Sequence, residues 1–122
     1  MRSTKIARPI QARAASSLAG LAQGWRREAA IRTHVTLSVA GLAGLTAAQA
    51  QASWLITGAV LMVAGLSCEL INAAVEALLD RLHPERDDAI GAAKDMCSAA
   101  AFLLNLAAAG AVAAGVISSL DG

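Results

Sequence analysis

Two long stretches without a single charged residue constrain this chain more than any other feature. No Asp, Glu, Lys or Arg occurs between Arg32 and Glu69, or between Asp95 and Asp121. The 122 residues are 57% hydrophobic, and a chain this short has too little interior to hide that much apolar surface from water. The sequence therefore predicts an all-α membrane protein with a single domain, residues 1–122.

Three apolar segments are the candidate transmembrane helices, at about residues 30–51, 54–79 and 97–120. A membrane-spanning helix needs about 20 mainly apolar residues, and the first segment reaches that length only when it is extended back to residue 30. Small residues dominate the third segment. Because small residues let membrane helices approach closely, we expect a helix bundle and an oligomer.

Residues 7–27 predict a helix with one apolar side. The apolar positions recur at helical spacing, and two arginines fall elsewhere around the helix: Ile10, Ala14, Leu18, Leu21 and Trp25 against Arg13 and Arg26. A basic amphipathic helix beside transmembrane segments is typical of a helix lying in the membrane surface. A helix packed on a soluble partner is the alternative.

The linkers and the distribution of arginines predict the topology. Residues 49–53 form an uncharged turn, whereas residues 80–95 form a polar loop that contains Pro84 and Gly91. Because basic residues favour the cytoplasmic side, the N-terminus and the 80–95 loop are expected in the cytoplasm.

The second apolar segment carries three polar residues that need an explanation. Glu69, Asn72 and Glu76 fall within about 60° of one another on a helix, so they share one face. Ionisable groups at membrane depth are costly and usually mark function. The alternative is that Glu76 reaches the headgroups and Glu69 pairs with a neighbouring helix.

Other polar residues have plain structural readings. Glu28 can pair with Arg32 at the i, i+4 spacing of a helix, and Lys94 can anchor at the interface or meet an anionic phosphate. His34 and His83 lack a partner at ligand spacing and are expected to be surface or interface groups. Glu28, Glu69 and Glu76 could converge at one interface, where such carboxylates suit Mg²⁺.

Known kinase signatures are absent from the sequence. It contains no GxxxxGK[ST] loop, and no GxGxxG followed by HRD and DFG. However, three runs together resemble the prokaryotic diacylglycerol kinase family: EAAIR from Glu28, ELINAAVEALLDR from Glu69 and GAAKDMCSAA from Gly91. The resemblance extends over roughly residues 8–118.

The resemblance implies a homotrimer of three-span subunits, each with an N-terminal surface helix, in the bacterial inner membrane. It implies transfer of the γ-phosphoryl group of ATP to diacylglycerol, with Mg²⁺, at the cytoplasmic interface; no nucleic acid partner is expected. Glu69 is the expected general base and Glu28 and Glu76 the expected Mg²⁺ ligands. The expected ATP-binding residues are Ser17, Glu28, Asn72, Glu76, Glu85, Arg86, Asp87, Lys94 and Asp95, and the expected lipid-binding residues are Ala14, Trp25, Arg32, Glu69 and Ser98.

The chain departs from the family pattern at three positions, and the acceptor lipid stays open. Pro9 stands where a basic residue is usual, Ala92 where arginine is frequent and Cys97 where glycine is typical. Undecaprenol kinase, a sister activity with the same catalytic residues, is the first alternative. A small transporter or helper subunit is the second, although its acids would be expected along a path across the membrane. A structural bundle is the third, but it has no need of Glu69 and Asn72.

Overall fold

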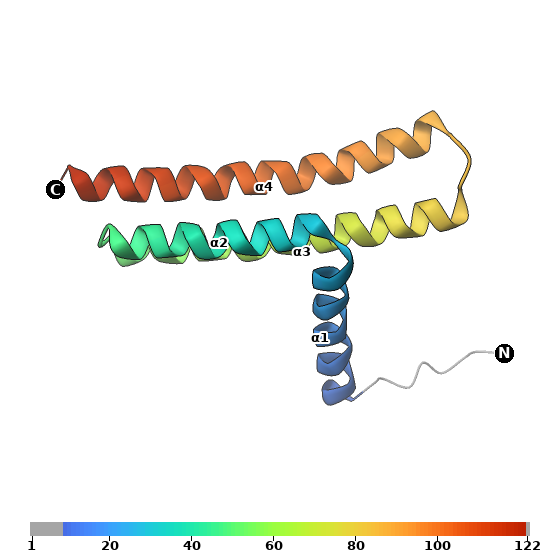
Figure 1. The fold of residues 1–122 in the computed structure, drawn as a ribbon, viewed down its shortest axis with the longest axis horizontal. Helices are drawn as coiled ribbons and strands as arrows, with labels where there is room; N and C mark the ends of the chain where they lie inside the picture. The colour runs from blue at the N-terminus through green and yellow to red at the C-terminus, as the bar shows by residue number, and fades with distance from the viewer. Residues whose placement is uncertain (1–8, 122) are drawn as a thin grey trace.

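The computed structural model describes residues 9–121 and folds them into four helices without a strand (Figure 1). The helices are α1 (Ile10–Arg27), α2 (Ala29–Ala47), α3 (Ala52–Leu82) and α4 (Asp88–Leu120). α2, α3 and α4 lie side by side, and α1 stands across them at the start of α2 (Figure 1). The prediction of an all-α protein is confirmed.

α3 and α4 are the two long apolar helices of the protein. At 1.5 Å per residue, the 31 residues of α3 extend about 46 Å and the 33 residues of α4 about 50 Å. Within residues 9–121, these two are long and apolar enough to cross a membrane. The 19 residues of α2 do not reach the same apolarity, so the first transmembrane segment stays a prediction.

The linker between α3 and α4 is much shorter than the predicted 80–95 loop, so that prediction is wrong. α3 continues to Leu82, α4 begins at Asp88, and only residues 83–87 connect them. The side chain of Asp87 accepts hydrogen bonds from the backbone N–H groups of Ala89 at 2.8 Å and Ile90 at 3.1 Å. These bonds satisfy N–H groups that have no partner inside the helix, so α4 begins well before its apolar stretch.

The chain breaks between α1 and α2 at Glu28, whose backbone is extended (φ −110°, ψ 116°). Arg32 turns back and donates from Nη1 to the carbonyl oxygen of Trp25 at 2.8 Å, at the end of α1. The predicted ion pair between Glu28 and Arg32 is wrong, because the i, i+4 spacing brings side chains together only within a continuous helix. Glu28 is thereby left free to face α3.

α1 has no buried side chain, and its apolar residues are exposed: Ile10, Leu18, Leu21 and Trp25. It touches the bundle near its end, where a Cβ added to Gly24 would lie 2.7 Å from Cδ2 of Leu70. The helix ends at residue 27 as predicted but begins at Ile10, one residue after Pro9, which precedes the helix instead of belonging to it; predicted residues 7 and 8 lie outside the described residues. Its place in the membrane surface stays a prediction.

Small residues bring α2, α3 and α4 together. The buried positions of α4 are Ala101, Ala108, Ala111 and Gly115. A Cβ on Gly115 would lie 2.5 Å from Cδ2 of Leu45 and 2.9 Å from Cβ of Trp54, so this glycine lets three helices meet. Leu45 is the one large side chain that is fully buried among the described residues.

Candidate active site

One face of α3 changes from small and apolar to polar along its length. Gly58, Met62 and Gly65 are buried against the neighbouring helices, and Glu69 follows at the next position of the same face. Asn72 and Glu76 continue that face, and both are half-buried, as is Glu69. The shared face expected from the sequence is present and turns toward α2 and α4.

The polar part of this face lines a cavity of about 390 Å³. The start of α2 contributes Glu28, Ala30 and Ile31 to its wall. α3 contributes Glu69, Asn72, Ala73 and Glu76, and α4 contributes Ser98, Ala101, Phe102 and Asn105. The structure thus brings five sequence-predicted site residues around the more polar of two cavities, called the polar cavity below: Glu28, Glu69, Asn72, Glu76 and Ser98.

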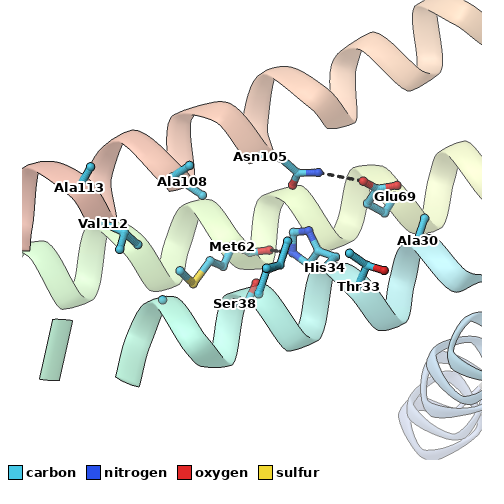
Figure 2. Close-up of a pocket in the computed structure, with 13 residues that line it drawn as sticks. Ala30, Thr33, His34, Ser38, Met62, Glu69, Asn105, Ala108, Val112 and Ala113 are labelled. Atoms are coloured by element: carbon cyan, nitrogen blue, oxygen red, sulfur yellow. Dashed lines mark hydrogen bonds between the residues drawn. The ribbon is translucent and has the colours of Figure 1, made fainter. Parts of the chain in front are cut away.

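A second cavity of about 560 Å³ lies deeper along the bundle, and its wall is mostly apolar (Figure 2). Leu37, Met62, Ala108 and Val112 are among the residues that line it. Three residues line both cavities: Ala30, Glu69 and Asn105. Glu69 therefore lies where an apolar cavity meets a polar one.

Among the described residues, Asn105 is the one hydrogen-bond partner of the Glu69 side chain, and it was not predicted from the sequence. Asn105 Nδ2 on α4 donates to Oε1 of Glu69 at 2.9 Å (Figure 2). Hydrogen bonds between membrane helices contribute about 0.6 kcal/mol on average, so this bond orients the carboxylate more than it stabilises the fold. The signal available in the sequence was a lone amide within a long apolar segment.

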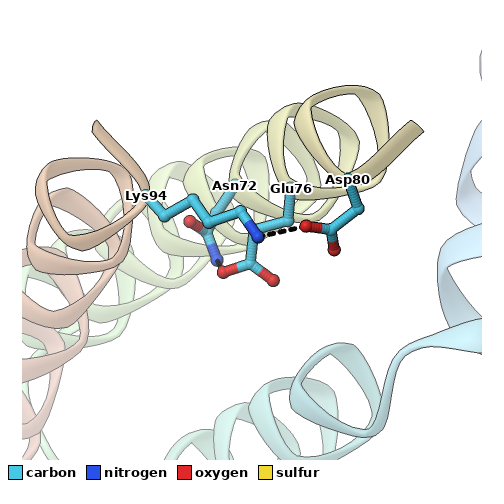
Figure 3. A network of polar contacts seen from close by, with 4 residues as sticks. All are labelled: Asn72, Glu76, Asp80 and Lys94. Atoms are coloured by element: carbon cyan, nitrogen blue, oxygen red, sulfur yellow. Dashed lines mark hydrogen bonds and ion pairs between the residues drawn. The ribbon is translucent and has the colours of Figure 1, made fainter. Parts of the chain in front are cut away.

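A second set of polar contacts continues along the exposed end of α3 (Figure 3). Asn72 Nδ2 lies 3.4 Å from Oε1 of Glu76, which is long for a hydrogen bond. Lys94 of α4 forms an ion pair with Asp80 of α3, the only salt bridge found within residues 9–121. The Oδ1 atoms of Asn72 and Asn105 are buried and have no hydrogen-bond partner within residues 9–121.

His34 is buried on α2, although it was predicted to be a surface or interface group. It is 9% exposed and lines the apolar cavity. Its Nε2 lies 2.8 Å from the carbonyl oxygen of Met62. Because a carbonyl oxygen only accepts, Nε2 carries the proton of this bond.

The remaining predicted residues line neither cavity. α1 carries Ala14, Ser17 and Trp25, all exposed, and the linker and the start of α4 carry Glu85, Arg86, Asp87, Lys94 and Asp95. The Ser17 hydroxyl donates to the carbonyl oxygen of Arg13 at 3.0 Å, within α1. Arg32 holds the end of α1, and Asp87 caps α4. Their roles in binding stay predictions.

Comparison with known families identifies the chain. The family model described as prokaryotic diacylglycerol kinase matches residues 15–117, which include all four helices in whole or in large part. The chain belongs to the prokaryotic diacylglycerol kinase family. Comparisons with curated proteins and with solved structures give no match. Membership in this family, together with the two long apolar helices, makes the chain a membrane protein and a lipid kinase.

Kinases of this family use ATP with a divalent metal ion. Within residues 9–121, no three His, Cys, Asp or Glu side chains form a group that could hold a metal by themselves. However, Mg²⁺ in kinases needs only one or two carboxylates, and the phosphates and water complete its coordination. The orphaned Oδ1 of Asn72 lies in the same cavity wall as Glu28 and Glu76, and oxygen atoms of this kind suit the ion.

Proposed function

We propose that this kinase transfers the γ-phosphoryl group of ATP to the hydroxyl of diacylglycerol and produces phosphatidic acid. The observation that carries the proposal is the position of Glu69, which lines both the apolar and the polar cavity. A lipid alcohol has an apolar body and a polar reactive end, and ATP phosphates need polar surroundings. Glu69 is the carboxylate that can meet both substrates.

In this proposal Glu69 is the general base that takes the proton of the lipid hydroxyl. The lipid hydroxyl oxygen attacks the γ-phosphorus, and its proton passes to the carboxylate of Glu69. The new O–P bond forms as the bond between the γ-phosphorus and the bridging oxygen breaks, and ADP leaves. The proton then passes from Glu69 to water, and the base is restored.

The other residues of the polar cavity position and neutralise the phosphates. Glu28 and Glu76 would hold Mg²⁺, which neutralises phosphate charge when bound, and Asn72 lines the same cavity. Ser98 of α4 lines this cavity and is exposed, so it can contact the lipid headgroup. Lys94 would bind a phosphate after it separates from Asp80.

The surroundings of the site support a membrane-interface location. Large apolar side chains of α3 and α4 are exposed along their length, such as Val63, Ile71, Phe102 and Ile117, and lipid or further copies of the chain would cover them. The polar ends of α3 and α4 and the arginine-rich N-terminal segment would then lie on the cytoplasmic side of the inner membrane. A homotrimer would place neighbouring copies against the same faces.

The experiment that tests the proposal follows label from γ-labelled MgATP into lipid, using the purified protein in a bilayer mimic. Diacylglycerol and undecaprenol are offered separately and in competition. Label in phosphatidic acid is expected, and Glu69→Gln should lower the rate of labelling about 10²-fold or more. Asp121→Asn, the same change at the far end of α4, is the control. If only undecaprenol is labelled, the acceptor is undecaprenol and not diacylglycerol. If Glu69→Gln keeps its activity, Glu69 is not the general base.

A further inference from the structure

Asn105 is the residue of α4 that reaches the reactive carboxylate. Its Nδ2 donates to Oε1 of Glu69 at 2.9 Å, across 36 positions of sequence (Figure 2). It lies on the packed face of α4, between the buried residues Ala101 and Ala108. No other hydrogen bond to the Glu69 side chain is found among the described residues. The orientation of this carboxylate therefore depends on one amide.

Gly65 and His34 lie close to the amide group of Asn105. A Cβ added to Gly65 would lie 2.8 Å from Oδ1 of Asn105 and 2.8 Å from Cε1 of His34. Both side chains thus occupy space that exists because residue 65 has no side chain. His34 is itself held by its hydrogen bond to the carbonyl oxygen of Met62 at 2.8 Å. Gly65 and His34 thus fix the position of the Asn105 side chain behind Glu69, while its amide group keeps the same shape when it rotates by half a turn.

The oxygen of the Asn105 amide has no hydrogen-bond partner in the part of the chain that the structure describes. The Oδ1 of Asn105 is buried without a hydrogen bond, and an unpaired buried acceptor is costly. An apolar residue would avoid that cost, so the fold alone does not explain an asparagine here. Such orphaned groups in a folded protein call for another explanation, and a functional role is one of them.

The chemistry of Glu69 supplies the explanation, on the basis of the function proposed above. As a carboxylate, Glu69 accepts from Nδ2. After it has taken the lipid hydroxyl proton it becomes a carboxylic acid, which can donate. Rotation of the amide group by half a turn brings Oδ1 to the place of Nδ2. An asparagine can therefore satisfy Glu69 before and after the proton transfer, whereas leucine satisfies neither state and aspartate lacks a donor for the first.

We propose that Asn105 is a positioning residue for Glu69, which orients the carboxylate toward the acceptor hydroxyl and stabilises both of its protonation states. The amide does not contact the reacting atoms. It acts through the carboxylate that does. Because a small misplacement of a catalytic group can reduce the rate about 10²-fold, the orientation of Glu69 is expected to control turnover.

The test measures kcat and both KM values for Asn105→Leu and Asn105→Asp, with MgATP and diacylglycerol as substrates. We expect kcat to fall about 10- to 100-fold in both variants, while the KM for each substrate stays within about twofold. Ser119→Ala is the matched control on α4. It removes a polar group whose hydrogen bond, to the carbonyl oxygen of Gly115 at 2.7 Å, lies far along the helix from Glu69. Its kcat should equal that of the wild type.

A double-variant measurement separates positioning from a structural role. In the Glu69→Gln background, adding Asn105→Leu should cause no further loss of the residual transfer rate, because the group through which Asn105 acts is already gone. Independent losses that multiply would overturn the inference. The inference would also be overturned if Asn105→Leu lowered the thermal unfolding midpoint and weakened MgATP binding together with its effect on kcat.

Failure of this inference is distinguishable from failure of the proposed function. If the wild type phosphorylates lipid, Glu69→Gln does not, and Asn105→Leu keeps full kcat, then the inference falls and the function stands. If Asn105→Leu raises only the lipid KM, Asn105 is a substrate contact and its positioning role is overturned. A wild type that labels no lipid would overturn the proposed function, and this inference with it.

Discussion

Lys94 of α4 and Asp80 of α3 form an ion pair at the polar end of the bundle, next to Glu76 (Figure 3). The Asp80 side chain is 66% exposed and that of Lys94 is 29% exposed. Exposed pairs of this kind contribute about 0–1 kcal/mol. The pair is therefore weak enough to open if an anionic ligand competes for the ammonium group of Lys94.

Variants of Lys94 and of Asp80 should distinguish a role in MgATP binding from a role in the stability of the fold. Lys94→Met is expected to raise the KM for MgATP about tenfold or more, because a charge-assisted hydrogen bond to phosphate is lost. Asp80→Asn should change that KM by about twofold at most and leave the thermal midpoint almost unchanged. Steady-state kinetics with varied MgATP would measure both. An unchanged KM in Lys94→Met would contradict a phosphate contact.

The capping role of Asp87 predicts a loss of stability on truncation. Asp87→Ala removes the acceptor for the backbone N–H groups of Ala89 and Ile90 and should cost about 1 kcal/mol. Asp87→Asn keeps an acceptor and should retain most of that stability. Thermal or denaturant unfolding in detergent distinguishes them. If the two variants unfold alike but differ in KM for MgATP, the carboxylate serves the nucleotide rather than the helix.

Gly115 and Gly110 offer a matched pair on α4. A Cβ at residue 115 would lie 2.5 Å from Leu45 Cδ2 and 2.9 Å from Trp54 Cβ, whereas a Cβ at residue 110 meets nothing within 4 Å. Gly115→Ala should destabilise the bundle by about 1–3 kcal/mol through overpacking. Gly110→Ala should be neutral or slightly stabilising because alanine favours the helix. Equal unfolding midpoints would contradict the close approach of α2 and α4.

The turn between α2 and α3 contains a strained residue. Gln49 has a φ of 54°, a left-handed conformation that glycine adopts without steric cost. Gln49→Gly is expected to raise stability by up to about 1 kcal/mol. Gln51→Gly serves as the comparison, because its φ of −57° already suits any residue. A lower unfolding midpoint for Gln49→Gly would show that its side chain contributes more than the backbone strain costs.

The face of α3 could be predicted because its information is local. Spacings of three and seven residues place Glu69, Asn72 and Glu76 together on any helix, and the structure keeps them together. Asn105 could not be predicted in the same way. Its contact with Glu69 depends on how α4 is placed lengthwise against α3, and a single sequence of small apolar residues does not specify that register.

The errors share a physical cause, which is reasoning about a residue without its tertiary neighbours. The ion pair of Glu28 with Arg32 assumed a continuous helix, but the backbone is extended at Glu28. His34 looked isolated because its partner is a backbone carbonyl on another helix. The 80–95 segment looked like a loop because it is polar, yet polar residues also form helices where these extend into water.

Glu69 is built into a long continuous helix rather than a loop, and about 20 Å of helix separates it from the end of α3 at Leu82. Its height in the bilayer is therefore set by how the apolar length of α3 matches the lipid around it. A thicker or thinner membrane would raise or lower the carboxylate relative to the lipid headgroups. The depth of Glu69 would therefore respond to the thickness of the surrounding bilayer, because no flexible loop separates this residue from the transmembrane part of α3.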